Sequence, residues 1–144
     1  MKKRAVLIAC VALVMAACSN PKLEKIDQLK KEAIAVHDEV MPRMGEIHDL
    51  QLKLKALRKN YTSDTTQMAQ EVDAQLRDKA EELEIANEAM MDWMAEYVVD
   101  FEKTAPEDSA VVYYTKQISA IEDVKLKMNE SIEDAEKYLE TFQD

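Results

Sequence analysis

Two histidines and two methionines lie on one side of a single predicted helix. His37, Met41, Met44 and His48 follow one another at intervals of four, three and four residues, so their side chains fall within about 60° of one another on an α-helix. Thioether and imidazole groups suit Cu(I), and a thioether needs no deprotonation before it binds. The pattern is therefore compatible with a soft-metal site. The alternative is core packing, because methionine commonly fills gaps between helices.

A second group of large side chains is expected to face the first. Folding the chain back near residue 63 brings Met90 opposite His37, with an uncertainty of about one helical turn. Trp93 and Tyr97 would then exclude water from the shared layer. The candidate binding or metal cluster comprises His37, Met41, Met44, His48, Met90, Trp93 and Met94.

Pro42 and Gly45 lie between the two histidines. A proline inside a helix removes one backbone hydrogen bond and crowds the carbonyl of Asp38, which costs about 3 kcal/mol before packing compensates, and a glycine loosens the next turn. We therefore expect a kink here. A kink can re-aim side chains for binding, or it can bend the helix around its neighbours.

The elements that must position these residues are three long amphipathic helices. Apolar side chains recur every seven residues from residue 22 to about residue 60, which is the pattern of a packed helix seam. Similar stripes cover 66–103 and 109–142, and short polar segments separate them. We expect an all-α fold, an up-down-up antiparallel bundle of three coiled-coil-like helices. A homodimer is the alternative, because long thin helices bury little surface per residue.

The amino terminus resembles a bacterial lipoprotein signal. Three basic residues precede an apolar run from residue 5 to residue 17, which is too short to span a membrane. The sequence VMAAC at its end is similar to the lipobox, in which small residues precede a lipidated cysteine, here Cys18. An ordinary secretory signal with an incidental cysteine is the alternative. We expect a signal peptide at 1–17, a lipidated tether at 18–22 and the three-helix bundle at 23–144.

Lipidation would place the protein on a membrane without crossing it. Two or more acyl chains anchor a protein stably, because each buried methylene contributes about 0.8 kcal/mol. Cys10 would leave with the signal and Cys18 would be acylated, so no thiol would remain for a disulfide, a nucleophile or a thiolate metal site. Ser19 resembles the residue found after the cysteine in signals sorted to the outer membrane. We expect a lipid-anchored, periplasm-facing position in the bacterial outer membrane.

The remaining chain is strongly acidic. Without the three basic residues of the signal, 16 Lys and Arg oppose 29 Asp and Glu, a net charge of −13. Such a charge repels nucleic acid, so we expect no nucleic-acid partner. Two histidines, one glycine and no mature thiol provide neither a phosphate-cradling loop nor a recognisable catalytic set. We expect no enzymatic activity, and no cofactor unless the Met and His cluster binds Cu(I).

Two segments carry a resemblance to a known group of proteins. HDEVMPRMGEI in the first helix and ANEAMMDWM in the second, behind the lipoprotein signal, resemble small Bacteroidetes lipoproteins of unknown function, some of which are labelled viral A-type inclusion protein. The likeness covers most of the mature chain. It implies lipoprotein character and a helical fold, and it implies no catalytic residues. We expect a membrane-anchored protein with a binding or scaffolding role toward an unidentified envelope protein.

Overall fold

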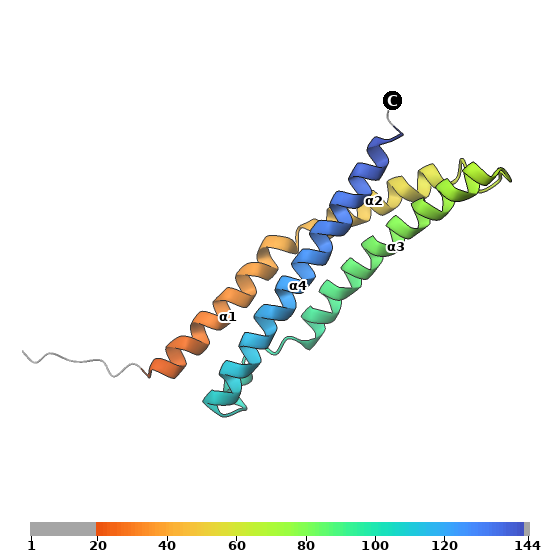
Figure 1. The fold of residues 1–144 in the computed structure, drawn as a ribbon. Coiled ribbons are helices and arrows are strands. Elements are labelled where there is room, and N and C mark those ends of the chain that lie inside the picture. The colour runs from red at the N-terminus through yellow and green to blue at the C-terminus, as the bar shows by residue number, and fades with distance from the viewer. Residues whose placement is uncertain (1–19, 143–144) are drawn as a thin grey trace, which may run out of the picture.

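The computed structural model describes residues 20–142, which form three long helical segments (Figure 1). The first segment comprises α1 (Pro21–Val40) and α2 (Arg43–Arg58), the second is α3 (Gln67–Glu96) and the third is α4 (Glu107–Glu140), preceded by the short 3-10 helix η1 (Phe101–Lys103). Residues 20–142 contain no β-strand. The prediction of an all-helical fold with three long helices is confirmed. The predicted signal peptide and Cys18 lie outside the described residues.

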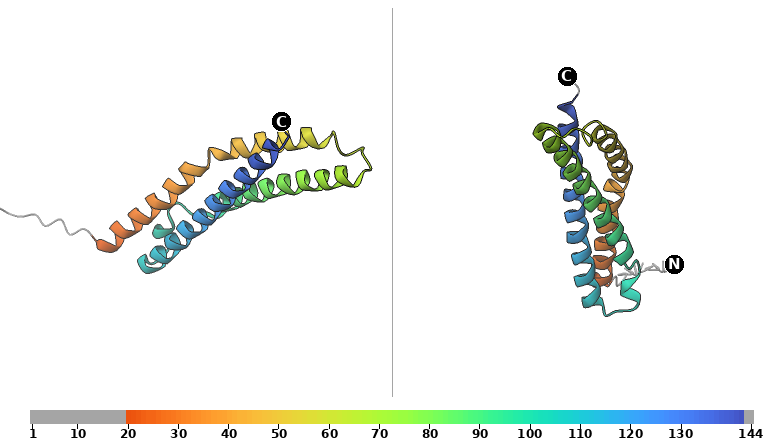
Figure 2. Two further views of the ribbon diagram at one scale, coloured as in Figure 1. Left: turned by 45° about the horizontal axis from the view of Figure 1, so that its top comes forward. Right: turned by 90° about the vertical axis from the view of Figure 1, so that its right-hand side faces the viewer.

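The helices form an elongated, bundle-like body in which α4 is the central element. It packs against α1, α2 and α3, while α2 also packs against α3 (Figures 1 and 2). The starts of α1 and α4 lie at one end of the body, and the connection between α2 and α3 lies at the other. None of the helices in the part of the chain that the structure describes combines the length and apolar character needed to cross a bilayer.

The seven-residue apolar pattern of the first segment is its buried face. The series continues across the break between α1 and α2. Both halves pack against α4, and α2 also packs against α3. Its buried members are Ile26, Leu29, Ala33, Val36, Val40, Ile47, Leu50 and Leu54. A main core runs along most of the body, and a smaller cluster at the starts of α1 and α4 contains Ile26, Leu29, Ala110 and Tyr114.

Side-chain caps begin two of the helices. The side chain of Asn20 accepts a hydrogen bond from the amide of Lys22 at 3.0 Å, and Pro21 occupies the first turn of α1, where a proline needs no amide partner. Thr66 caps α3 by accepting from the amide of Ala69 at 3.3 Å. Because α1 begins at Pro21, the last residues of the segment predicted as a tether are helical.

The second predicted helix is too long in the sequence-based interpretation. It ends at Glu96 rather than near residue 103, and an irregular loop with η1 follows. Two tyrosine hydroxyls of α4 accept hydrogen bonds from the amides of Val98, at 2.7 Å, and Phe101, at 3.0 Å. These amides therefore have partners outside a helix, which compensates for ending α3 early.

Candidate functional site

The break between α1 and α2 falls at Met41 and Pro42. Both residues keep right-handed helical backbone angles, and the amides of Met44 and Gly45 bond to carbonyls three residues earlier, at 3.2 and 3.3 Å. Proline has no amide hydrogen, so the carbonyl of Asp38 lacks its usual helical partner. A side chain at Gly45 would meet no atom within 4 Å, so the turn does not require glycine. The break bends the first segment (Figure 2).

Polar contacts fasten both sides of this bend to α4. On the α1 side, Glu39 accepts from Lys125 at 2.8 Å. On the α2 side, Arg43 donates to Glu46 at 2.9 Å and also to the side chain of Asn129. Both sides of the bend are therefore connected to α4.

His37 packs as a flat ring against α3. Its imidazole lies 5.5 Å from the ring of Trp93 at an angle of 25°, and its Nδ1 lies 2.9 Å from a carboxylate oxygen of Asp38. The indole N–H of Trp93 donates to the carbonyl of Gln117 on α4 at 3.2 Å. The sequence predicted Met90 opposite this histidine, and the ring contact is instead with Trp93, less than one turn further along α3.

The other members of the predicted cluster are divided between the core and the surface. Met90 is fully buried in the main core, and Met44 and Met94 pack against that core while partly buried. Met41 is 44% exposed, and His48 is exposed in a shallow groove between α2 and α3. Within residues 20–142, no three His, Cys, Asp or Glu side chains gather in a way that could hold a metal ion. Any soft-metal site here would therefore depend on thioethers.

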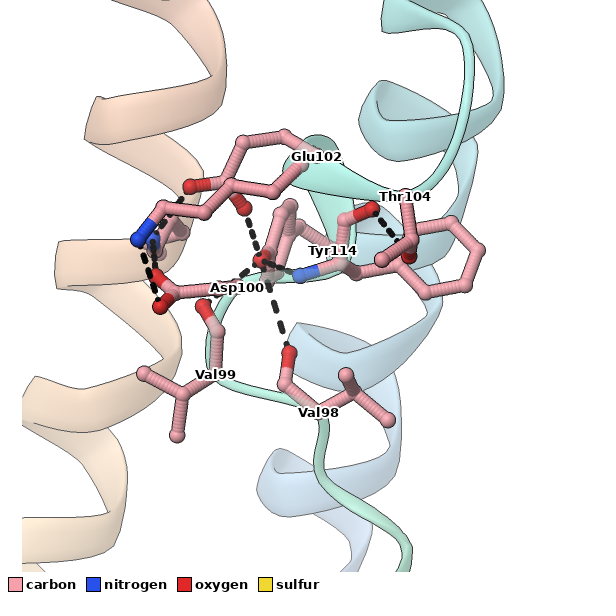
Figure 3. A network of polar contacts seen from close by, with 9 residues as sticks. Val98, Val99, Asp100, Glu102, Thr104 and Tyr114 are labelled. Atoms are coloured by element: carbon pink, nitrogen blue, oxygen red, sulfur yellow. Dashed lines mark hydrogen bonds and ion pairs between the residues drawn. The ribbon is translucent and has the colours of Figure 1, made fainter.

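The sequence did not predict a polar network at the start of α4, which we call the tyrosine clamp: Lys30, Asp100, Glu102 and Tyr114 (Figure 3). The buried hydroxyl of Tyr114 donates to Glu102 at 2.5 Å and accepts from the amide of Phe101 at 3.0 Å. Lys30 on α1 donates to the other oxygen of Glu102 at 2.6 Å and to Asp100 at 3.3 Å. The clamp thus joins α1, the loop and α4.

The clamp shifts the pKa of each group in its centre. Burial opposes ionisation of Glu102, but hydrogen bonds from Lys30 and Tyr114 outweigh it and lower the pKa of that carboxyl. Burial likewise opposes the charge on Lys30, yet its bonds to Glu102 and Asp100 raise the pKa of that ammonium. Burial, and then the bond to Glu102, raises the pKa of the Tyr114 hydroxyl. A fixed carboxylate, ammonium and neutral phenol suit a structural tie, because none titrates near neutral pH.

Aromatic rings connect the clamp to the predicted cluster. Trp93 lies 4.8 Å from Tyr97 between ring centres, and Tyr97 lies 6.2 Å from Tyr114. Tyr113 then contacts Tyr114 at 5.1 Å and stacks on Phe101 at 4.1 Å. Among the described residues, the buried hydroxyl of Tyr97 makes no hydrogen bond. This aromatic column comprises His37, Trp93, Tyr97, Tyr114, Tyr113 and Phe101.

No family model, curated protein or solved structure matches this chain. The bend, the aromatic column and the tyrosine clamp must therefore be interpreted from their own chemistry. They hold helices and a loop in fixed positions, and their ionisable groups bind one another.

Proposed function

We propose that this protein is a lipid-anchored, acidic helical lipoprotein of the bacterial cell envelope with a non-enzymatic binding or scaffolding role. The observation that carries the proposal is that α1 starts at one end of an elongated body (Figure 1). The N-cap of that helix is Asn20, two residues after Cys18. Asn20 donates to Glu107, the first residue of α4, at 2.8 Å. An acylated Cys18 would hold the body by that end. The 34 residues of α4 would then extend about 50 Å along the body.

We infer an up-down-up antiparallel arrangement for the three long segments. Short connections join consecutive segments, as such an arrangement requires. Arg58 at the end of α2 forms an ion pair with Asp73 near the start of α3 at 2.7 Å. Tyr113 near the start of α4 accepts from Val98, just after the end of α3. Both contacts join residues on either side of a chain reversal and support the inferred topology.

The bend offers a surface for an envelope protein. Ile34 on α1 and Met41 in the break are seven residues apart and are 38% and 44% exposed. Because Met41 keeps helical backbone angles, the two side chains share one outer face. Asp38 lies between them on the same face. Because the bend is fastened to α4, these side chains would be presented in a fixed geometry, which reduces the entropy lost on binding.

Labelling with radioactive palmitate in a bacterial host tests the anchor. We expect the full chain to incorporate label and to fractionate with the outer membrane, and the Cys18→Ser variant to do neither. Protease treatment of intact cells should leave the protein intact if it faces the periplasm. Equal palmitate incorporation and equal outer-membrane association of both variants would contradict the anchor, and digestion of the protein in intact cells would contradict the orientation.

Photo-crosslinking in the same cells tests the binding role. We expect a photoreactive residue at Met41 to give a discrete adduct. The same residue at Leu126, which is 56% exposed on α4, serves as the matched control. Absence of an adduct at Met41, or the same adduct from both positions, would contradict a partner surface at the bend.

Periplasmic Cu(I) binding is the second candidate function. It is favoured by one observation: Met44, Met90 and Met94 belong to the same core region as Trp93, on which His37 stacks. Competitive Cu(I) titration tests it. Binding lost in His37→Ala and Met90→Ala, but kept in Met68→Ala, which changes a methionine that is 76% exposed, would support a metal site. Binding no tighter than that of a weak chelator would contradict it.

A further inference from the structure

We propose that the anchored end of the protein docks on the membrane surface through a collar of exposed apolar side chains. The inference rests on the lipid anchor proposed at Cys18. The collar consists of Leu23 on α1, Val98 and Val99 in the loop before η1, and Val112 on α4. Their exposed fractions are 48%, 48%, 62% and 55% in that order.

The start of α1 is fastened beside the start of α4. Lys22, the neighbour of Leu23, forms an ion pair with Asp108 at 2.7 Å. The bond from Asn20 to Glu107 lies at the same junction. Leu23 therefore stands in the first turn of α1 at the level of the first turn of α4, and Val112 follows about one turn later on α4.

The loop valines are exposed although their backbone is held. The amide of Val98 donates to the hydroxyl of Tyr113 at 2.7 Å, and the carbonyl of Val99 lies 2.9 Å from the hydroxyl of Tyr114. In Figure 3 the side chains of Val98 and Val99 point away from the clamp. Exposed apolar side chains on a fixed backbone favour binding to a membrane, because the loop loses little conformational entropy when it binds.

Ion pairs near the collar reduce the electrostatic repulsion that the protein's net negative charge would cause at lipid head groups. At the collar end, Asp100, Glu102 and Asp108 each pair with a lysine at 2.6 to 2.8 Å. Paired charges project a weaker field than the unpaired acidic residues that give the mature chain its net charge. The collar can therefore approach lipid head groups with less repulsion than an unpaired acidic end would meet.

The short link between Cys18 and α1 favours the lipid bilayer as the surface that the collar contacts. Asn20 is the second residue after Cys18, so the chain between their Cα atoms spans at most about 7 Å. A lipidated Cys18 would therefore hold the collar end against the head-group region, where apolar side chains bind by partial insertion. A second copy of the chain and a soluble protein are the competing occupants.

Fluorescent labelling of the anchored full chain tests the docking. The mature chain holds no thiol besides Cys18, so Val99→Cys and Val112→Cys each provide one site for an environment-sensitive dye. Leu52→Cys and Leu126→Cys are matched controls, because these leucines are 53% and 56% exposed and lie away from the collar. Each protein is purified from membranes and reconstituted into phosphatidylcholine vesicles with or without nitroxide-labelled lipid.

We expect the dyes at positions 99 and 112 to shift to the blue and to lose intensity with nitroxide lipid, and both control dyes to stay water-like. If the chain floats with the vesicles but all four dyes stay water-like, docking is overturned and the anchor stands. If the chain does not float with vesicles, the anchor is overturned as well. A blue shift that appears without lipid and grows with protein concentration would identify a second copy and overturn membrane docking.

Discussion

Two tyrosine-to-phenylalanine changes separate the effect of the clamp from the effect of burial. Tyr114 is fully buried and its hydroxyl joins Glu102 to the amide of Phe101. Tyr114→Phe removes a hydrogen bond to a charged group, worth about 1.5 to 3 kcal/mol, and leaves a buried amide without its partner. Because the two effects overlap, we expect the free energy of unfolding to fall by about 2 to 3 kcal/mol, or the Tm by about 10 °C.

Tyr97→Phe is the matched control. It removes a buried hydroxyl that makes no hydrogen bond within the described residues, so stability should stay unchanged or rise by up to about 1 kcal/mol. Urea unfolding followed by circular dichroism measures both variants. Equal losses in the two would refute the reasoning, because the cost would then follow the loss of any buried hydroxyl rather than the clamp bonds. A loss confined to Tyr97→Phe would refute it more directly.

Three further changes and one measurement test the other parts of the account. Glu102→Gln should cost most at neutral pH and progressively less as the pH falls below about 4.5, because a lowered carboxyl pKa contributes stability only while the group is ionised; acid titrations of unfolding compare it with the wild type. Gly45→Ala should raise stability by about 0.5 to 1 kcal/mol, since its side chain meets no atom, and a fall in Tm would contradict an unstrained turn. Met90→Ala should cost about 2 to 5 kcal/mol in urea unfolding, whereas Met91→Ala at a half-exposed position should cost little. Sedimentation of residues 19–144 should give a monomer if the bundle-like body is self-sufficient, and a homodimer would point to the longer coiled coil.

The all-helical fold was predictable because it depends on the regular spacing of apolar residues, which is visible within each segment of the sequence. Ile26, Ala33 and Val40 on α1 continue as Ile47 and Leu54 on α2 at the same interval of seven, and all five are buried. The series passes through the break without a change of phase. The apolar pattern therefore identifies the buried face even where the backbone does not continue as one regular helix.

The end of α3 was not predictable in the same way. Tyr97 and Phe101 follow Trp93 at helical spacing, so the apolar pattern extends beyond Glu96. The helix ends because hydroxyls from α4 bind amides of the next few residues, and Lys30 reaches Glu102 across 72 positions of sequence. Contacts of that range depend on the register between helices, which a single sequence leaves uncertain by about one turn. This uncertainty also explains why Met90 was predicted opposite His37, whereas the structure places the ring of Trp93 there.

The candidate cluster also shows that residue spacing along one helix does not predict which side chains are buried. Spacing places His37, Met41, Met44 and His48 on one side, but burial depends on where the neighbouring helices lie. Met44 packs against the core while Met41, beside Pro42, remains exposed. Spacing therefore identifies which side chains share a face, and only the packing determines which of them can meet.

Three polar ties of α1 lie in its first turns, where an anchor would pull on it. An acylated Cys18 would transmit any force on the protein to the first turns of α1, and isolated helix ends fray readily. Asn20, Lys22 and Lys30 oppose such fraying by binding Glu107, Asp108 and Glu102. If these ties serve the anchor, Tyr114→Phe should raise amide hydrogen exchange first in residues 21–30 and leave α2 protected. Uniform loss of protection along α1 and α2 would instead mean that the clamp stabilises the whole body without a special role at the anchored end.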